Sequence, residues 1–343
     1  MAEKVSMNTI AKKLGISKNT VSLALRGMPG ISENTRKLIL NTAVELGYEY
    51  KAAGKQDAAA RSLCLVIPKS AQNSIDFFSY IQMSIEDEAK KNNMNTILHY
   101  YDENDEEFQM PLCVREGMIS GIITLGRVSE RTVRALDTYD LPIIMVDNYF
   151  DDLEVDCVLT DNHYGGYVST EYLIKNGHIR IGFFGDIKAS ISFYDRYMGY
   201  LKALDCYNIK SVKEDALFVN YTEAPVYEEI TQRLECLKDQ GRLPTAFVCC
   251  NDAGAIVLYK ILKQIGISVP EQISVIGFDD ISAASDISPE LTTMQVKKEL
   301  MGRKSVRKLL QRFGENDGIA EKLLLSATLV ERNSVIKLNR GRT

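Results

Sequence analysis

The chain has 343 residues, a length that predicts two or three compact units. Its composition, with 45% hydrophobic and 25% charged residues and a net charge of −5, is that of a folded globular protein and excludes a disordered or collagen-like chain. The longest apolar runs are far shorter than the ~20 residues of a membrane-spanning helix, and the first residues lack the apolar stretch of a secretory signal. We therefore expect a cytoplasmic protein without a membrane partner.

The charge is unevenly distributed along the chain. Residues 1–61 contain ten Lys or Arg and five Asp or Glu, whereas the remainder contains 31 basic and 41 acidic residues. A basic segment joined to an acidic one suggests a polyanionic partner for the basic segment. A solvated charged surface is the alternative, and the sequence pattern must decide between the two.

The cysteines and histidines argue against redox and metal chemistry. The seven cysteines are odd in number, scattered, and never spaced as CxxC. The adjacent pair Cys249 and Cys250 closes an apolar run that is typical of a core strand, so we expect structural cysteines rather than a redox pair. The three histidines lie 64 and 15 residues apart, which is not metal-site spacing. The sequence predicts no metal site and no cofactor.

The basic N-terminal segment has the pattern of three short helices. Ser6, Ser17 and Ser32 are placed to cap them, and Gly15 and Gly47 are placed to end the first and the third. The expected inward-facing positions are Met7, Ile10, Ala11 and Leu14, then Val21, Ala24 and Leu25, then Ile39, Leu40, Ala43 and Leu46. This order predicts a helix-turn-helix. A three-helix cap without a ligand is the alternative.

In such a module the N-terminal end of the second helix enters the major groove of DNA. Lys18 and Asn19 are placed to meet base edges, and an asparagine can form two hydrogen bonds with adenine. Serine and lysine side chains around the helix ends are placed to contact phosphates. The predicted DNA-binding residues are Ser6, Ser17, Lys18, Asn19, Thr20, Ser22, Leu23, Arg26, Ser32, Lys37, Lys51 and Lys55.

Residues 10–25, continued by 31–36 and 45–48, strongly resemble the headpiece of the LacI/GalR family of bacterial transcription regulators. Further segments resemble the family in the same order: 161–166, 177–182, 251–252, 269–270, 277–280, 289–293 and 332–334. The resemblance covers essentially the whole chain. It implies a headpiece that binds operator DNA and a body that binds a small effector.

Two departures from the family pattern affect DNA binding. Leu23 stands where family members commonly have Arg, so we expect an apolar contact, for example with a thymine methyl, and an unusual operator. In the hinge, Gly54 disfavours a helix and Asp57 replaces an apolar residue that would wedge into the minor groove. Lys51 and Lys55 are instead expected to follow the DNA backbone electrostatically.

The body alternates short apolar runs with helical stretches, a pattern typical of parallel sheets. The expected strands are 63–67, 96–100, 121–125, 143–146, 157–160, 181–185, 246–250 and 274–278, and the expected helices are 78–92, 164–176, 196–204, 226–239 and 253–264. One eight-stranded sheet is possible. The resemblance implies two doubly wound parallel-sheet subdomains of the periplasmic-binding-protein type, separated by a cleft. The expected boundaries are a headpiece 1–48, a hinge 49–62 and a body 63–343, with an N-subdomain of about 63–161 and 292–323 and a C-subdomain of about 162–291 and 324–343.

Polar residues follow three of the expected strands, where ligands of parallel sheets bind: Asp161, Asn251 and Asp279. The resemblance adds Arg196, which matches the effector-binding arginine of the family, and Tyr221, in a segment that supplies an aromatic face. Carboxylate, amide and guanidinium groups suit the hydroxyls of a sugar, which is the predicted effector. For each of the five residues a surface or capping role is the alternative.

Other features favour a binding protein over an enzyme. The chain has no GxGxxG, GxxxxGK[ST] or GxSxG motif. Asp279 and Asp280 are paired acids, but residues adjacent in the chain rarely converge on one bond as general acid and base. Asp147, Asp252 and Asp280 are expected to be structural or rim residues. A transport binding protein would require a signal sequence and no helix-turn-helix.

Because one half-site is small, we expect a homodimer on a roughly palindromic operator. An effector that prefers the closed cleft would shift the affinity for DNA. The sequence thus predicts a DNA-binding transcriptional repressor controlled by a sugar-like effector. The same fold responding to a nucleobase corepressor or to a phosphorylated carrier protein remains open, as does a cytoplasmic sugar-binding protein that does not bind DNA.

Overall fold

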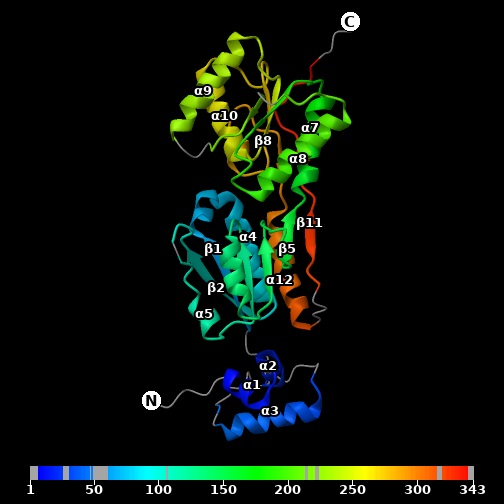
Figure 1. Cartoon of the computed structure of the whole chain (residues 1–343). Coiled ribbons are helices and arrows are strands. Elements are labelled where there is room, and N and C mark those ends of the chain that lie inside the picture. Colours follow the sequence, from blue (N-terminus) through cyan, green and yellow to red (C-terminus); the bar gives the residue numbers. More distant parts are fainter. Residues whose placement is uncertain are drawn as a thin grey trace. The chain divides into compact units, whose positions relative to one another are not determined.

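The computed structural model describes residues 7–25, 31–46, 48, 61–105, 107–212, 215–220, 224–314 and 319–338. The chain divides into two compact units, Met1–Ala59 and Ala60–Thr343. In Figure 1 the helices of the first unit are blue, and the second unit runs from cyan to red. We call the first unit the headpiece and the second unit the body.

The headpiece consists of α1 (Met7–Leu14), α2 (Lys18–Leu25) and α3 (Glu33–Glu45). Gly15 has a φ of +65°, the left-handed conformation that lets the chain turn sharply after α1. The Ser17 Oγ accepts a hydrogen bond of 3.0 Å from the Thr20 amide, and Ser32 caps α3 in the same way. These observations confirm the predicted helix-turn-helix and two of its serine caps. The Ser6 cap and the Gly47 stop lie outside the described residues.

One small core holds the three helices together. Ile10, Val21 and Ile39 are fully buried in it. The prediction for Leu40 was wrong, because 40% of this residue is exposed and Thr42 is buried in its place. Thr42 and the predicted Ala43 follow Ile39 by three and four residues and therefore share its face, whereas Leu40 is rotated by about 100° around the helix.

The body contains two parallel sheets. The larger sheet has the order β11-β5-β4-β3-β1-β2, and the smaller sheet has the order β7-β6-β8-β9. The strands of these two sheets are β1 (Arg61–Pro68), β2 (Met94–Tyr101), β3 (Gly121–Leu125), β4 (Ile143–Val146), β5 (Asp156–Thr160), β6 (Ile181–Phe184), β7 (Ala216–Leu217), β8 (Ala246–Cys249), β9 (Ser274–Ile276) and β11 (Lys322–Leu325). A separate antiparallel pair joins β10 (Thr293–Gln295) to β12 (Thr328–Val330).

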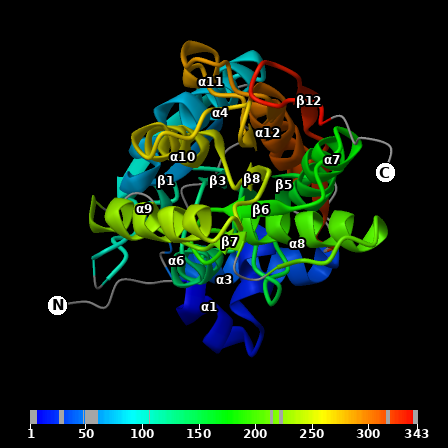
Figure 2. The same cartoon turned by 90° about the horizontal axis from the view of Figure 1, so that it is seen from above.

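Helices cover both faces of the larger sheet. Leu65 of β1 packs with residues of α4 and α12, which lie side by side in Figure 2, whereas the adjacent Val66 packs with residues of α5 and α6. This alternation is the two-residue period of a strand whose two faces are both buried. The helices of the body are η1 (Lys69–Ser74), α4 (Ile75–Lys91), α5 (Leu112–Arg115), α6 (Glu130–Asp137), α7 (Asn162–Lys175), α8 (Ile191–Cys206), α9 (Ala224–Asp239), α10 (Asp252–Gln264), α11 (Ala283–Asp286) and α12 (Lys298–Gly314).

The smaller sheet shares one core with its helices. Leu173 of α7, Tyr200 of α8, Leu234 of α9 and Leu258 of α10 are all buried in it. The chain passes from β5 in the larger sheet to β6 in the smaller one, and returns for β11 after β10 and α12. Loops from both sheets therefore meet where the chain crosses.

All eight expected strands form, and they fall into two sheets, so the single eight-stranded alternative was wrong. The five expected helices also form. The short strands β7, β10, β11 and β12 were not expected, and neither was α12. Gly302 interrupts the helical pattern of α12, because it lies against α4 where a Cβ would come within 2.6 Å of the Ile81 carbonyl oxygen.

Candidate functional site

The predicted DNA-contacting positions cluster around α2. Lys18 and Asn19 form the first turn of this helix, as expected for residues that enter the groove. Their side chains and that of Ser22 lie outside the description, as do the predicted residues Ser6, Arg26, Lys51 and Lys55. Of the remaining positions, Ser17, Ser32 and Lys37 are exposed, and Thr20 and Leu23 are half-buried.

Two of the serines predicted to contact phosphate act as helix caps. Ser17 Oγ lies 2.8 Å from the Thr20 hydroxyl in addition to accepting the Thr20 amide. Ser32 forms the equivalent pair of contacts with Thr35. Since a cap fixes where a helix begins, Ser17 sets the position of the first turn of α2.

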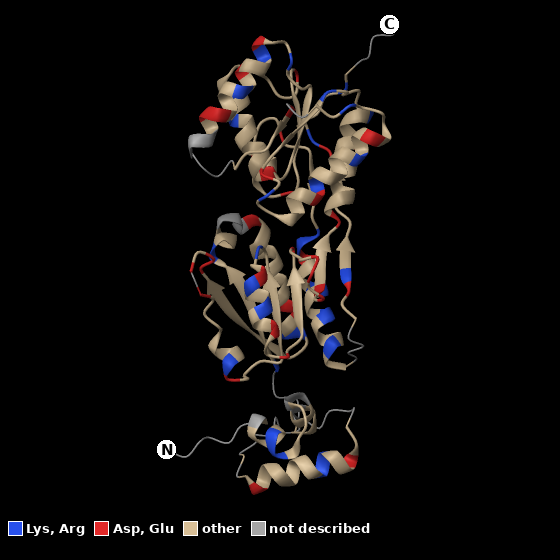
Figure 3. Ribbon diagram, in the orientation of Figure 1, with Lys and Arg blue, Asp and Glu red and all other residues tan. Residues whose placement is uncertain are grey.

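The charged residues of the headpiece helices are mostly basic (Figure 3). Lys12 and Lys13 end α1, and Lys37 lies on the exposed side of α3. Arg36 donates a hydrogen bond of 3.2 Å to the Ala24 carbonyl oxygen and so ties α3 to the end of α2. The exposed lysines supply positive charge for a nucleic-acid partner.

In the body, Arg196 of α8 is the centre of the predicted effector site. It is 2% exposed. Its Nε donates to Asn162 Oδ1 at 2.8 Å, its Nη1 donates to the Cys250 carbonyl oxygen at 2.6 Å, and its Nη2 lies 3.1 Å from Asp279 Oδ1. The guanidinium also lies 3.7 Å from the centre of the Phe278 ring. One buried cation thus joins the loops after β5, β8 and β9.

The position of Arg196 depends on a glycine contact between α7 and α8, which lie side by side in Figures 1 and 2. A Cβ on Gly166 would overlap the carbonyl oxygen of Arg196, and a Cβ on Gly199 would overlap that of His163. The two helices can approach this closely only because both positions are glycine.

Asp279 follows β9 and is buried beside Arg196. Its φ is +115°, a conformation that costs energy for any residue except glycine. Burial raises the pKa of its carboxyl group, and the charges of Arg196 and Lys298 oppose that shift. Backbone strain together with a buried carboxylate is typical of ligand-binding loops.

Asp147 belongs to the same cluster, although the sequence analysis gave it only a structural or rim role. It follows β4, has a φ of +61°, and its Oδ1 lies 3.5 Å from Ser192 Oγ. Burial raises its pKa to about 7, the charge of Arg196 lowers it, and that of Asp279 raises it. The available signal was its place directly after a predicted strand, the same signal that selected Asp161.

Asp161 and Asn251 act as helix caps here. Asp161 accepts the Tyr164 amide at 3.0 Å at the start of α7, and Asn251 accepts the Gly254 amide at 2.9 Å at the start of α10. Their chain neighbours, Asn162 and Cys250, are the groups that bind Arg196. Both residues therefore lie next to the arginine cluster, and effector contact by either stays a prediction. Tyr221 lies outside the described residues.

Two further acids make structural contacts. Asp252 accepts the Thr293 hydroxyl at 2.5 Å and the Ile281 amide at 3.0 Å, and burial followed by the charge of Asp279 raises its pKa to about 7. Asp280 is paired with Arg332 at 2.7 Å. Although burial acts in the opposite direction, hydrogen bonds from Arg332 and Gln295 lower the pKa of Asp280.

Loops from the two sheets meet around a pocket of about 540 Å³, which we call the mouth pocket. Arg127, after β3, donates through Nη1 to the Ala189 carbonyl oxygen at 2.8 Å in the loop before α8. The Tyr149 hydroxyl, after β4, lies 3.2 Å from Asp195 Oδ2 on α8. These two hydrogen bonds hold the loops of the larger sheet to the smaller sheet.

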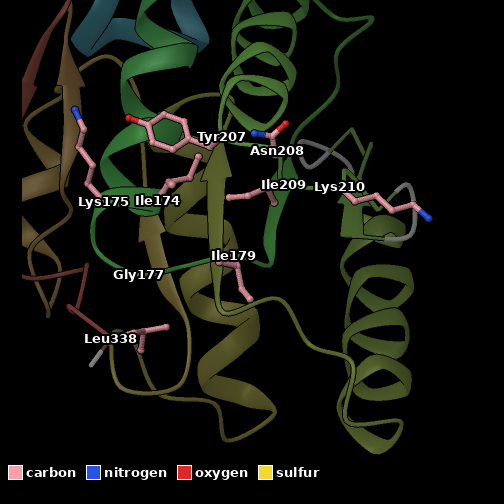
Figure 4. Close-up of a pocket in the computed structure, with 9 residues that line it drawn as sticks. All are labelled: Ile174, Lys175, Gly177, Ile179, Tyr207, Asn208, Ile209, Lys210 and Leu338. Atoms are coloured by element: carbon pink, nitrogen blue, oxygen red, sulfur yellow. The ribbon is translucent and has the colours of Figure 1, made fainter. Parts of the chain in front are cut away.

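A hollow of about 770 Å³ lies elsewhere in the body (Figure 4). It is lined by Gly177 and Ile179, which precede β6, and by Tyr207 and Asn208, which follow α8. It therefore lies at the amino end of β6, opposite the edge where parallel sheets bind ligands. Figure 4 shows Lys210 extending away from the other labelled side chains.

Within the described ranges, no three His, Cys, Asp or Glu side chains are grouped in a way that could hold a metal ion. Among the same residues, no helix has the length and apolar composition needed to span a membrane.

Two family models match the chain. The model for bacterial regulatory proteins of the lacI family matches residues 6–50, and the model for a periplasmic binding protein-like domain matches residues 170–335. The first match contains the three headpiece helices, and the second contains all of the smaller sheet.

Curated relatives match over nearly the full length. The ribose operon repressor of Haemophilus influenzae is 27% identical over 97% of this chain and 99% of its own, and the HTH-type transcriptional repressor PurR of Pasteurella multocida is 28% identical over 96% and 98%. A solved lacI-family transcriptional regulator from Enterococcus faecium, with bound ribose, is 27% identical with a TM-score of 0.67, and the match covers 81% of this chain and 100% of that one. Headpiece, body and relatives agree: the chain belongs to the lacI family of bacterial regulatory proteins and is a DNA-binding transcriptional regulator.

Proposed function

We propose that this regulator is a repressor that works in the cytoplasm as a homodimer and responds to a small sugar bound where the two sheets meet. The observation that carries the proposal is the buried Arg196, surrounded by Asp279 and Asp147 at the carboxyl ends of strands from both sheets. We retain the predicted subdomain boundaries, about 63–161 with 292–323 and 162–291 with 324–343. In this division a ligand at Arg196 touches both subdomains.

The chemistry of this cluster suits a polyol. Carboxylates accept hydrogen bonds from hydroxyl groups, and a guanidinium donates to ring and hydroxyl oxygens. Ser192 adds a hydroxyl 3.5 Å from Asp147. Relatives named as a ribose operon repressor and as a ribose-bound regulator support a sugar rather than another small molecule.

In the structure each of the three guanidinium nitrogens of Arg196 has a protein partner. A sugar that replaces one of these partners changes the packing between the loops after β5, β8 and β9. If the sugar binds one arrangement of the loops more tightly, it shifts the equilibrium by that difference in affinity. This coupling connects effector binding to operator binding.

An apolar surface on the larger sheet supports the homodimer. The strand β2 is the last strand of that sheet and exposes Leu98 and Tyr100, and the neighbouring helix α4 exposes Met83. The Tyr100 hydroxyl donates to Gln82 at 3.0 Å, which shows that strand and helix are adjacent. Exposed apolar side chains on an edge strand are suited to pairing with a second copy.

The first experiment is a thermal-shift screen of the full-length protein with sugars, nucleobases and phosphorylated carrier protein. A ligand at 100 times its Kd adds ~2.7 kcal/mol to the stability of the folded state, which such a screen detects. We expect a sugar to give the shift and Asp279→Asn to remove it. A shift with a nucleobase or carrier protein alone would instead favour one of those alternatives.

A duplex-binding titration at several salt concentrations tests the DNA arm of the proposal. We expect sequence-specific binding that weakens steeply as salt rises, because the lysines of the headpiece displace counterions from phosphates. Asn19→Ala should reduce specificity by about 1–3 kcal/mol, and Lys37→Ala should weaken all sequences alike. Weak binding that does not depend on salt would support the sugar-binding protein that does not bind DNA.

A further inference from the structure

The mouth pocket lies at the edge of the proposed effector site. Arg127, Tyr149 and Lys188 line it, and they come from the loops after β3, β4 and β6. These are the carboxyl ends of parallel strands, where α/β sheets bind ligands. Its volume of about 540 Å³ falls within the range of roughly 300–1,000 Å³ of small-molecule sites.

The pocket lies next to the part of the arginine cluster that contains Asp147. Its wall includes Asn148, the next residue after Asp147. The charge of Arg127 acts on the Asp147 carboxylate, which in turn lies 3.5 Å from Ser192 Oγ. A molecule bound between Asp147 and Arg196 can therefore extend a substituent into the mouth pocket.

Hydrogen-bond donors dominate the polar groups of the pocket. Arg127 uses Nη1 for the Ala189 carbonyl oxygen, which leaves Nε and Nη2 without a partner among the residues described. The exposed Lys188 ammonium forms no ion pair within the same ranges. Ser190 Oγ accepts the Ser192 amide at 3.1 Å, so its own hydroxyl hydrogen is free to be donated.

The acidic group of the pocket has a cationic neighbour. Asp151, which also lines it, lies 3.8 Å from the Lys322 ammonium. The lining thus presents the cationic side chains of Arg127 and Lys188, while the Asp151 carboxylate has Lys322 as a neighbouring cation. Two tyrosines, Tyr149 and Tyr194, complete the wall and offer aromatic faces for the ring that carries the substituent.

We propose that the mouth pocket binds an anionic substituent of the effector, so that the effector is the phosphate monoester of a sugar, with its phosphate held by Arg127 and Lys188. Arginine and lysine bind phosphate oxygens through charge-assisted hydrogen bonds, which are stronger than those to neutral groups. This inference rests on the proposed sugar effector and specifies in addition that this sugar carries a negatively charged phosphate group.

The test compares neutral sugars with their phosphate esters by calorimetric titration of the full-length protein. Ribose and ribose 5-phosphate form the first pair, followed by other aldopentoses and aldohexoses, and inorganic phosphate is titrated alone. We expect the ester to bind at least about tenfold more tightly than its sugar, the effect of one charge-assisted hydrogen bond. K188Q and R127Q should each reduce the ratio of the two affinities toward one.

Lys202→Gln is the matched control, because Lys202 is a half-exposed lysine of α8 that does not line the pocket. This variant should keep the full ratio. Equal binding of sugar and ester, or a ratio that K188Q leaves unchanged, overturns the phosphate subsite and leaves the sugar effector standing. Inorganic phosphate that binds as tightly as the ester also overturns it, since the anion is then bound without a sugar. If no sugar and no ester binds, both the subsite and the proposed effector class are wrong.

Discussion

At the scale of single residues, Arg196 has the most partners in the proposed effector site. It contacts three loops through three different nitrogens, which a lysine cannot reproduce because its ammonium is a single point. We expect Arg196→Lys to destabilise the body by about 3–5 kcal/mol, the cost of breaking a buried ion pair, and to abolish the effector-induced thermal shift.

Arg180 provides the matched control for this substitution. It forms two hydrogen bonds with the buried Asp215, at 2.9 and 2.7 Å, at the amino end of the smaller sheet. Arg180→Lys should lower the melting temperature but retain the effector-induced shift. Loss of the shift in both variants would mean that reduced stability, and not the site, explains the result.

Tyr149 is the second residue whose role can be tested singly. Its hydroxyl bonds the Asp195 carboxylate across the two sheets, and its ring lies 3.9 Å from the Lys322 ammonium. Tyr149→Phe removes the hydrogen bond and keeps the ring. Because hydrogen bonds to charged groups are worth about 1.5–3 kcal/mol, we expect roughly tenfold weaker effector binding in a calorimetric titration.

Tyr164→Phe serves as its control, since Tyr164 is a half-exposed tyrosine on α7. Effector affinity in this variant should match that of the unmodified protein. If Tyr149→Phe also left the affinity unchanged, the Tyr149–Asp195 bond would play no part in holding the sheets together around the ligand.

At the scale of elements, the contact between α7 and α8 is the feature most sensitive to a small change. A methyl group at Gly166 would overlap the carbonyl oxygen of Arg196 and push the helices apart. We expect Gly166→Ala to cost about 1–3 kcal/mol in chemical unfolding, as overpacking does. Gly314 lies at the end of α12, where an added Cβ would have no packing neighbour within 4 Å. Gly314→Ala should therefore be neutral or slightly stabilising.

The elements also show how far sequence reasoning reached. The headpiece helices and the eight main strands follow from apolar period and capping residues, which are local signals. The helix α12 was missed because Gly302 is needed for contact with α4, a cause that lies far away in the sequence. The short strand β11 was missed because its residues alternate between exposed and half-buried, without the buried run of a central strand.

The proposed effector site could be derived from the sequence only in part, for the same reason. Arg196 and Asp279 were identified and lie together, as strand ends and the family resemblance implied. Asp147 was given a lesser role, since nothing in its own segment shows that Ser192 and Arg196 face it. That information comes from how two sheets meet, which local sequence does not encode.

At the scale of the whole molecule, the apolar surface of β2 and α4 should control assembly. We expect Leu98→Glu to produce a monomer in light scattering, because a charge on an edge strand opposes pairing. Operator affinity should fall by about 10²–10⁴-fold, because a monomer binds with one headpiece and loses the avidity of two linked headpieces. Effector binding should persist.

Ile179→Glu is the control, because Ile179 is also an exposed apolar residue, 60% exposed against 41% for Leu98, but lies before β6 in the other sheet. This variant should remain dimeric. A dimeric Leu98→Glu protein would place the interface elsewhere.

The pH dependence of stability is also a property of the whole fold. Burial raises the pKa of Asp147 from an ordinary 3.8 to about 7, so the folded state holds a proton that the unfolded state has released between these values. Stability from this group is complete below the ordinary pKa and is lost as pH rises through about 7. We expect Asp147→Asn to flatten the fall in melting temperature between pH 4 and 7. An unchanged pH profile would show that Asp147 titrates normally.

Lys298 begins α12, and its buried ammonium donates to the carbonyl oxygens of Asp279 and Asp280 at 3.2 and 2.8 Å. The loop that carries Asp279, a carboxylate of the proposed effector site, is therefore attached to one end of a 17-residue helix about 25 Å long. If the loop moves, either the first turn of α12 moves with it or the two hydrogen bonds of Lys298 break. Lys298 therefore couples any change in the conformation of Asp279 to a helix that packs on the larger sheet.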